Sequence, residues 1–139
     1  MITFNYLFPV DDFKTKEVRL KQWIIKVIHC ENKRSGDIAY VFCNDEQLHE
    51  INLKFLDHDT LTDIITFPTT HSNEIISGEI YISIPRVFEN ATHSNGIWYD
   101  ELSRVIIHGI LHLIGYNDHS PEEKVMMRAK EDYYLTLRP

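Results

Sequence analysis

The chain has 139 residues, 43% of them hydrophobic, and carries a formal net charge of −7 with a sequence pI of about 5.5. This length suits one globular domain with its own core and is too short for two full domains. The negative charge excludes a protein that binds nucleic acid through its overall field, so any contact with nucleic acid requires a local basic patch.

The cysteines and the apolar runs indicate the compartment. Cys30 and Cys43 are the only cysteines, and they match neither a disulfide framework nor a CxxC metal pair. No segment approaches the roughly 18 uninterrupted apolar residues of a membrane span. The opening MITFNYLFPVDDF lacks the basic lead of a signal peptide. We therefore expect a reduced, cytoplasmic protein with no membrane partner.

The first half of the chain alternates strands and helices. ITFNY (2–6) predicts a short strand. From Thr15 to about Asn32, apolar residues recur at helical spacing among several basic ones, which predicts an amphipathic helix with a basic outer face. DIAYVFCND (37–45) predicts a second strand, and EQLHEINLKFL (46–56) predicts a second helix.

The second half begins with two strands and ends with two helices. TDIITFP (62–68) is rich in β-forming residues, and in GEIYISI (78–84) isoleucines alternate with other residues as in a half-buried strand. Helices are expected over about Asp100–Ile114 and over Pro121–Leu135. The order βαβαββαα predicts an α+β fold, a small mixed four-stranded sheet packed with helices. Since no linker interrupts the chain, residues 1–139 are expected to form a single domain.

The helix expected over 100–114 is apolar nearly all round, so it should be buried at the centre of the fold. His108 and His112 are four residues apart and therefore share one face of this helix. Gly115 ends the helix, and a short turn leads to His119, directly before the SPEE that starts the next helix. This turn can fold His119 back over the last helical turn.

Three imidazoles at this spacing suit one zinc ion or another divalent transition metal. Three protein ligands leave a fourth position open, as in catalytic zinc sites, and a water bound there can have a pKa of about 7. The competing interpretation is a solvent-facing stripe or core histidines bonded to backbone carbonyls, which is common for a lone HxxxH pair. The apolar surroundings and the third histidine favour a metal site formed by His108, His112 and His119.

The stretch HGILHLIGYNDH (108–119) resembles the HxxxHxxGYDH signature of the YbeY-type rRNA-maturation endoribonucleases, single-domain bacterial proteins with a zincin-like metal site. INLKFLDHDTLTDIITFP (51–68) and GEIYISI are similar to further stretches of that family in the same order. The resemblance implies a zincin-like fold whose central buried helix carries the metal ligands. It also implies a metal-dependent endoribonuclease for single-stranded RNA that acts in rRNA processing and ribosome maturation, with RNA or the ribosome as partner.

Two departures from the family pattern affect the expected site. The family has histidine directly after GYD, whereas GYND holds one more residue, so that His119 lies seven rather than six residues after His112. The family also tends to carry an arginine, a candidate phosphate contact, where this chain has Leu56. Asp118 is the first candidate for the proton-transferring residue because it lies near the histidines. Its alternative role is that of a turn residue bonded to its own backbone.

Residues 14–34 hold seven of the 14 lysines and arginines of the chain. Most charged helix faces are merely solvated. An acidic protein that binds RNA nevertheless needs a source of positive charge, and phosphate contacts are made by such residues. We therefore expect Lys14, Lys21 and Lys26, together with Arg104 nearer the metal, to contact RNA.

Two other functions stay open at this point. A metallopeptidase would use the same metal chemistry, but Gly109 stands where its HExxH motif has the catalytic glutamate. A ribosome-associated factor could instead hold the metal only for stability. Loss of cleavage in a folded His112 variant would favour an enzyme, whereas unfolding on chelation would favour a structural metal.

Overall fold

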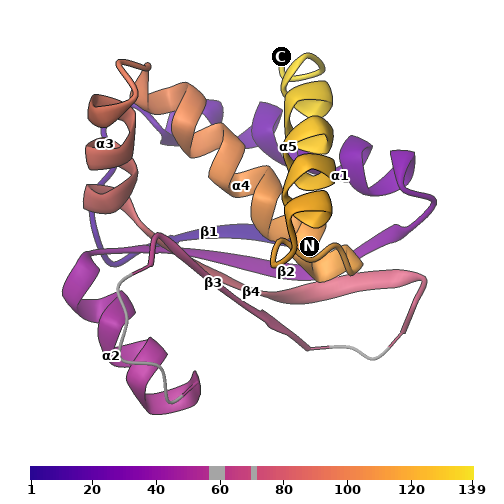
Figure 1. Cartoon of the computed structure of the whole chain (residues 1–139), viewed down its shortest axis with the longest axis horizontal. Coiled ribbons are helices and arrows are strands. Elements are labelled where there is room, and N and C mark those ends of the chain that lie inside the picture. Colours follow the sequence, from indigo (N-terminus) through magenta and orange to yellow (C-terminus); the bar gives the residue numbers. More distant parts are fainter. Residues whose placement is uncertain (57–61, 70–71) are drawn as a thin grey trace.

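The structure is a computed structural model that describes residues 1–56, 62–69 and 72–139 (Figure 1). Asp57 to Leu61, part of the stretch that resembles the YbeY-type family, lie outside the described residues. The strands are β1 (Ile2–Tyr6), β2 (Arg34–Cys43), β3 (Ile64–Pro68) and β4 (Ile75–Ser83). The helices are α1 (Glu17–Cys30), which follows the short 3-10 helix η1 (Lys14–Lys16), α2 (Asp45–Leu56), α3 (Ile84–His93), α4 (Trp98–Ile114) and α5 (Pro121–Leu135).

The strands form one sheet in the order β1-β2-β4-β3. β1 and β4 both run parallel to β2, and β3 runs antiparallel to β4. Along β2 the buried side chains of Ile38, Tyr40 and Phe42 point to one face, as the period of two in a strand requires. The predicted α+β class and mixed four-stranded sheet are confirmed.

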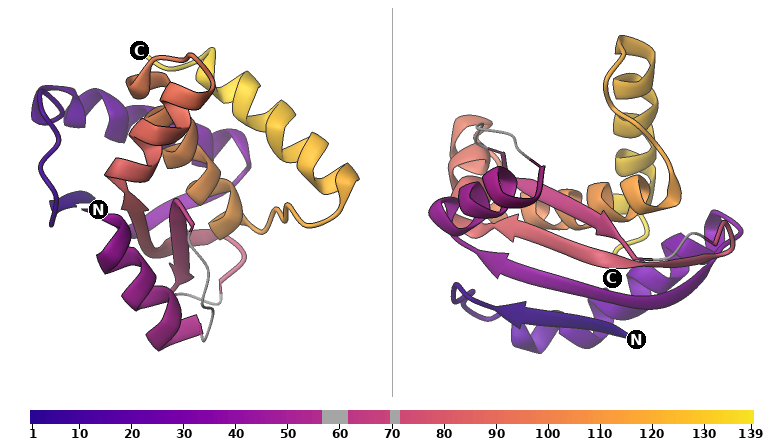
Figure 2. Two further views of the ribbon diagram at one scale, coloured as in Figure 1. Left: turned by 60° about the vertical axis from the view of Figure 1, so that its left-hand side comes forward. Right: turned by 90° about the horizontal axis from the view of Figure 1, so that it is seen from below.

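Helices cover both faces of this sheet (Figures 1 and 2). α1 and α4 pack on one face over the main core, and α5 packs against α4. α2 lies on the opposite face over a smaller cluster formed by Cys43, Leu48 and Ile65. This arrangement places α4 between the sheet and α5, so that one side of α4 faces the pocket described below.

α4 is the central helix that the sequence predicted. Its apolar residues from Leu102 to Leu111 are almost completely buried. Gly109 permits the close approach to the sheet, because a Cβ at this position would meet atoms of Ile64 and Ile80 at 3.0 Å. The hydroxyl of Tyr40 on β2 donates to the backbone carbonyl of Ile106 at 3.0 Å and ties the helix to the sheet.

The helix α3 was not predicted from the sequence, so the observed order is βαβαββααα rather than βαβαββαα. The strand expected to reach Ile84 ends at Ser83, whose hydroxyl caps α3 by accepting the backbone N–H of Arg86 at 3.3 Å. Pro85 has no N–H to donate to the sheet ladder, but it is well suited to the first turn of a helix. A serine followed by a proline was therefore a local signal for a helix start.

Candidate metal centre

Three ligand atoms from α4 and the following loop converge on one point. The Nε2 atoms of His108 and His112 lie 2.9 Å apart. The Oδ2 atom of Asp118 lies 3.3 Å from Nε2 of His108 and 3.5 Å from Nε2 of His112. A tetrahedral ion with zinc–nitrogen bonds of about 2.0–2.1 Å keeps neighbouring ligand atoms about 3.3 Å apart. The three side chains therefore fit a shared metal ion.

His119 lies beside this cluster, and Asp118 occupies the third place in it. The side chain of His119 is exposed and lines the same pocket as His108 and His112, while its backbone N–H donates to Glu123 at 3.2 Å. Asp118 is also the sixth residue after His112, the spacing at which the YbeY signature has its third histidine. The structure thus brings a carboxylate to the position for which the sequence suggested His119.

Glu131 of α5 orients His108. Its Oε2 atom lies 2.6 Å from Nδ1 of His108, and its other oxygen accepts from Arg104 at 2.9 Å. Arg104 also donates to Asp132 at 2.7 Å. Glu131 is buried, so the bond from Nδ1–H fixes the imidazole tautomer and leaves the Nε2 lone pair directed at the site.

The same contacts set the electrostatics of the two histidines. Burial works against protonation of His108, but its hydrogen bond to Glu131 and the charges of nearby carboxylates raise its pKa above the ordinary value. Burial and the charge of His108 lower the pKa of His112. His112 is therefore the more readily neutral of the two rings, and neutral imidazole is the form that binds metal.

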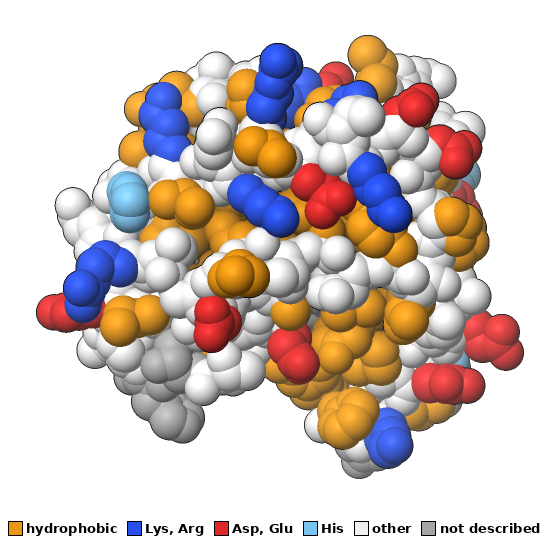
Figure 3. All heavy atoms as spheres, turned by 180° about the vertical axis from the view of Figure 1, so that it is seen from behind, with side chains coloured by type: hydrophobic (Ala, Val, Ile, Leu, Met, Phe, Trp, Pro, Cys, Tyr) orange, Lys and Arg blue, Asp and Glu red, His pale blue; other side chains and the backbone are white. Residues whose placement is uncertain are grey.

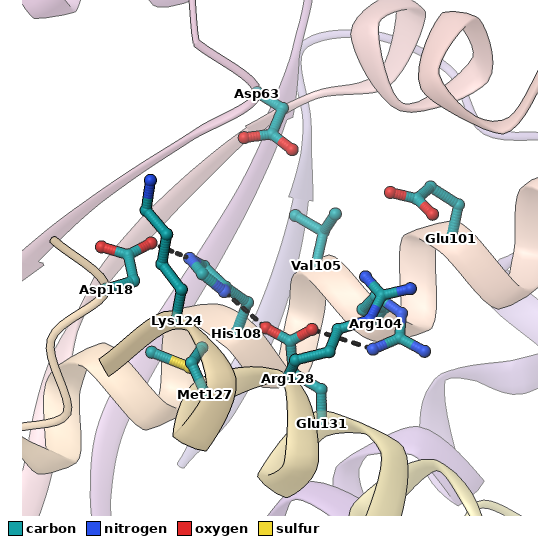
Figure 4. A pocket seen from close by; sticks show the side chains of 10 residues that line it. All are labelled: Asp63, Glu101, Arg104, Val105, His108, Asp118, Lys124, Met127, Arg128 and Glu131. Carbon is teal, nitrogen blue, oxygen red and sulfur yellow. Dashed lines mark hydrogen bonds and ion pairs between the residues drawn. The ribbon is translucent and has the colours of Figure 1, made fainter. Parts of the chain in front are cut away.

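Two adjoining pockets meet at this centre, and both are lined by Asp63, His108 and Asp118. In Figure 4 the carboxylate of Asp63 faces the pocket from the end of the sheet, across from Asp118. Burial raises the pKa of Asp63, and the nearby His108 partly opposes this rise. The first pocket continues between α4 and α5, and its remaining lining residues are Glu101, Arg104, Val105, Lys124, Met127, Arg128 and Glu131.

The predicted RNA-contacting residues fall in two places. Arg104 lines the first pocket, but its guanidinium is already paired with two carboxylates. Lys14, Lys21 and Lys26 line neither pocket, and the ammonium groups of Lys14 and Lys21 lie over the rings of Tyr6 and Phe4. Seen from behind, where α1 lies, basic side chains alternate with acidic and hydrophobic ones (Figure 3). RNA contact by these four residues stays a prediction.

α5 contributes three charged side chains to the pocket that were not predicted as site residues. Lys124, Arg128 and Glu131 all line the first pocket. They are spaced four and three residues apart, so they share one face of the helix. The spacing in the sequence indicates that these three side chains form one charged face of α5. That this face lines the pocket beside the histidines is known only from the tertiary structure.

Comparison with known proteins gives a consistent result. A family model described as Endoribonuclease YbeY matches residues 8–137. A protein from Flavobacterium johnsoniae named Endoribonuclease YbeY is 48% identical over 139 residues, covering 99% of this chain and 96% of the relative. One of the same name from Christiangramia forsetii is 47% identical, covering 96% and 92%. The solution structure of TM1509 from Thermotoga maritima superposes with a TM-score of 0.68 at 28% identity, covering 97% of this chain and 87% of that one.

Proposed function

Because this chain belongs to the YbeY endoribonuclease family, it is a hydrolase that acts on RNA, and we propose that it cleaves single-stranded ribosomal RNA during ribosome maturation. The observation that supports metal-dependent cleavage is the convergence of His108, His112 and Asp118 within an open pocket. In this proposal, residues 1–139 form one endoribonuclease domain that works in the cytoplasm on RNA or on the ribosome. Among the described helices, none has the length and apolar character that a membrane crossing needs.

The donor set suits a divalent transition metal. Two imidazoles and one carboxylate bind zinc in catalytic sites, and the same set also accepts iron and related metals. We propose one zinc ion or a related divalent metal. When bound, this metal supplies Lewis acidity, which lowers the pKa of a coordinated water and polarises a phosphoryl oxygen.

The protein residues around the centre have separate tasks in this proposal. His108 and His112 hold the metal, and Glu131 keeps the lone pair of His108 directed toward it. If Asp118 is the third ligand, Asp63 is the carboxylate placed to accept a proton from the attacking water, and its raised pKa suits a general base. If His119 is the third ligand, that task falls to Asp118.

Metal analysis of variants separates these two assignments. Asp118→His restores a three-histidine set at the position of the signature histidine, so it should keep the metal and much of the cleavage if Asp118 is a ligand. It should keep the metal but lose cleavage if Asp118 transfers the proton. His119→Ala is the matched control, and loss of metal in this variant with retention in Asp118→Ala would assign His119 as the third ligand. Elemental analysis of purified protein gives the metal content.

The proposed function is tested by cleavage of a labelled single-stranded rRNA fragment with and without chelator. We expect cleavage to disappear with chelator, to return with added zinc, and to be absent in His112→Ala while circular dichroism shows an intact fold. For the role in ribosome maturation, a bacterial strain lacking its own family member should accumulate rRNA precursors. The wild-type chain should correct this defect and His112→Ala should not. Cleavage that persists without metal would contradict the proposal.

The metallopeptidase alternative finds no support on α4. A Cβ at position 109 would meet Ile64 and Ile80 of the sheet at 3.0 Å, so a side chain there has no room. The glutamate that follows the first histidine in HExxH peptidases therefore has no equivalent place here.

A further inference from the structure

Among the described residues that line the two pockets, the positive charges lie on one wall. The second pocket is lined on its far side by Asn52, Leu56 and Thr62, and among its described lining residues there is no lysine or arginine. The first pocket has three, namely Arg104, Lys124 and Arg128. Among the described lining residues, the cationic side chains that an anionic substrate meets in the two pockets all lie on α4 and α5.

The start of α5 offers no free anion site. Ser120 and Glu123 form a capping box, in which the Glu123 carboxylate accepts the backbone N–H of Ser120 at 2.8 Å and that of His119 at 3.2 Å. These bonds lower the pKa of Glu123. The helix N-terminus thus already holds a carboxylate, so a phosphate group near α5 has to be bound by side chains.

Of the three cations in the first pocket, only Lys124 and Arg128 are available. The guanidinium of Arg104 already forms ion pairs with both Glu131 and Asp132. The ammonium of Lys124 has no ion pair within the parts of the chain that the structure describes. Among the described residues, the one ion pair of Arg128 is a contact of 4.0 Å between its Nε and Asp132, at 66% exposure of its side chain, and such exposed pairs contribute little.

The two available cations are arranged along the path away from the metal centre. Lys124 and Arg128 lie one helical turn apart on the same face of α5. In Figure 4 Lys124 reaches from α5 past Asp118 toward the Asp63 side of the pocket, and Arg128 lies farther along α5 beside Arg104. Lys124 is therefore the cation next to the proposed metal ligands.

We propose that Lys124 and Arg128 bind phosphate groups of the RNA, Lys124 at the phosphate that is cleaved and Arg128 at a neighbouring one. This inference rests on the proposed endoribonuclease function and adds the residues that hold its substrate. Lysine acts as a compact charge that can neutralise the charge building up on the reacting phosphate, and the planar fork of arginine suits a bidentate grip on the next phosphate. Without these cations, the carboxylates of Asp63 and Glu101 would repel the RNA.

Salt titration of RNA binding tests this inference. The probe is a fluorescein-labelled single-stranded 2′-O-methyl RNA, checked for integrity on a gel, and binding to the metal-loaded protein is followed by fluorescence anisotropy. For single strands, each phosphate contact contributes about 0.7 to the slope of log affinity against log salt. Lys124→Gln/Arg128→Gln should therefore flatten the slope by about 1.4. It should weaken binding at low salt by roughly tenfold or more and leave the metal content unchanged.

Lys33→Gln/Arg34→Gln at the start of β2 is the matched control, since it removes the same charge from residues that line neither pocket. We expect it to change the slope much less. Lys124→Arg, which keeps the charge, should retain the wild-type slope. An unchanged slope in the α5 variant, an equal loss in both double variants, or a wild-type protein that does not bind the RNA would overturn the inference. A wild-type protein that binds with the expected slope but cleaves no RNA would contradict the proposed function and leave the phosphate site standing.

Discussion

At the scale of single residues, the geometry of His108 depends on a carboxylate that lies 23 residues away in the sequence. Glu131 bonds to the ring nitrogen that faces away from the site, and Arg104 holds Glu131 in place. Such partners fix both the tautomer and the orientation of a metal-binding imidazole, and their loss typically reduces metal affinity by about 10- to 100-fold.

We therefore predict that Glu131→Ala weakens zinc binding by about one to two orders of magnitude, measured by competition with a chromogenic chelator. Glu131→Gln, whose carbonyl oxygen can still accept from Nδ1–H, should lose less. Asp132→Asn is the matched control, because Asp132 contacts the same arginine but not His108. Equal affinity in Glu131→Ala and wild type would show that His108 needs no such support.

The sequence motif identifies two of the metal ligands but does not decide which residue is the third. His108 and His112 were recognised from their spacing on one helix, since helical geometry alone places them on one face. The choice between Asp118 and His119 depends on how a short turn bends, and adjacent residues in a turn can point in opposite directions. The contact between His108 and Glu131 was not predictable from the sequence, because it joins two helices whose relative position follows from the packing of the whole core.

At the scale of elements, the loop after α4 is anchored to both α1 and α5. Gly115 ends α4 with a φ of 124°, a conformation that few other residues adopt. The next residue, Tyr116, donates its hydroxyl to Glu31 at the end of α1 at 2.5 Å, and Lys130 of α5 binds the same carboxylate at 3.0 Å. Tyr134 also donates to Glu31. The loop that carries Asp118 is thus held by a partly buried carboxylate from the first half of the chain.

This anchor predicts a pH-dependent contribution to stability. Burial alone would raise the pKa of Glu31, but hydrogen bonds from two tyrosines and Lys130 outweigh it and lower the pKa. A lowered folded-state pKa means that the unfolded chain binds more protons. The contribution is therefore complete above the unfolded value of about 4.3 and is lost as the pH falls through the lower folded value. The free energy of unfolding in urea should differ more between wild type and Glu31→Gln at neutral pH than in acid.

Equal differences at both pH values would show that the charge of Glu31 contributes nothing. The exposed Glu122→Gln on α5 is a suitable control, since no ion pair holds this side chain in the described part of the chain.

Elements were predicted best where their signals are local. The boundaries of α5 were correct because serine, proline and glutamate mark its start within a few residues. β2 begins at Arg34, three residues before the expected start, because its first residues pair with β4, a partner distant in sequence. α3 was missed although Ser83 and Pro85 mark its start, because the alternation of isoleucines extends through Ile84 and obscures that signal.

At the scale of the whole molecule, an acidic protein has to bind an acidic polymer. The pocket wall formed by α2 contributes Leu56, whose exposed fraction is 38%, and no cation among the described residues of that wall. The distribution of charge, rather than its sum of −7, determines where RNA can lie.

We predict that Leu56→Arg tightens binding of single-stranded RNA and steepens its salt dependence by about 0.7, the contribution of one added phosphate contact. The same anisotropy titration measures this change. Leu53→Arg on α2 is the control, since Leu53 has a similar exposure of 42% but does not line the pocket. A similar gain in both variants would indicate a general effect of charge rather than an RNA path past Leu56.

The position of α5 has a consequence for the time at which activity begins. Among the described elements α5 is translated last, and it supplies Glu131, Lys124 and Arg128 to a centre whose histidines are made earlier. A nascent chain still attached to a ribosome at α4 has the histidines but neither the support for His108 nor the cations of the pocket. The metal centre and its cationic pocket wall can therefore be completed only after α5 has been synthesised.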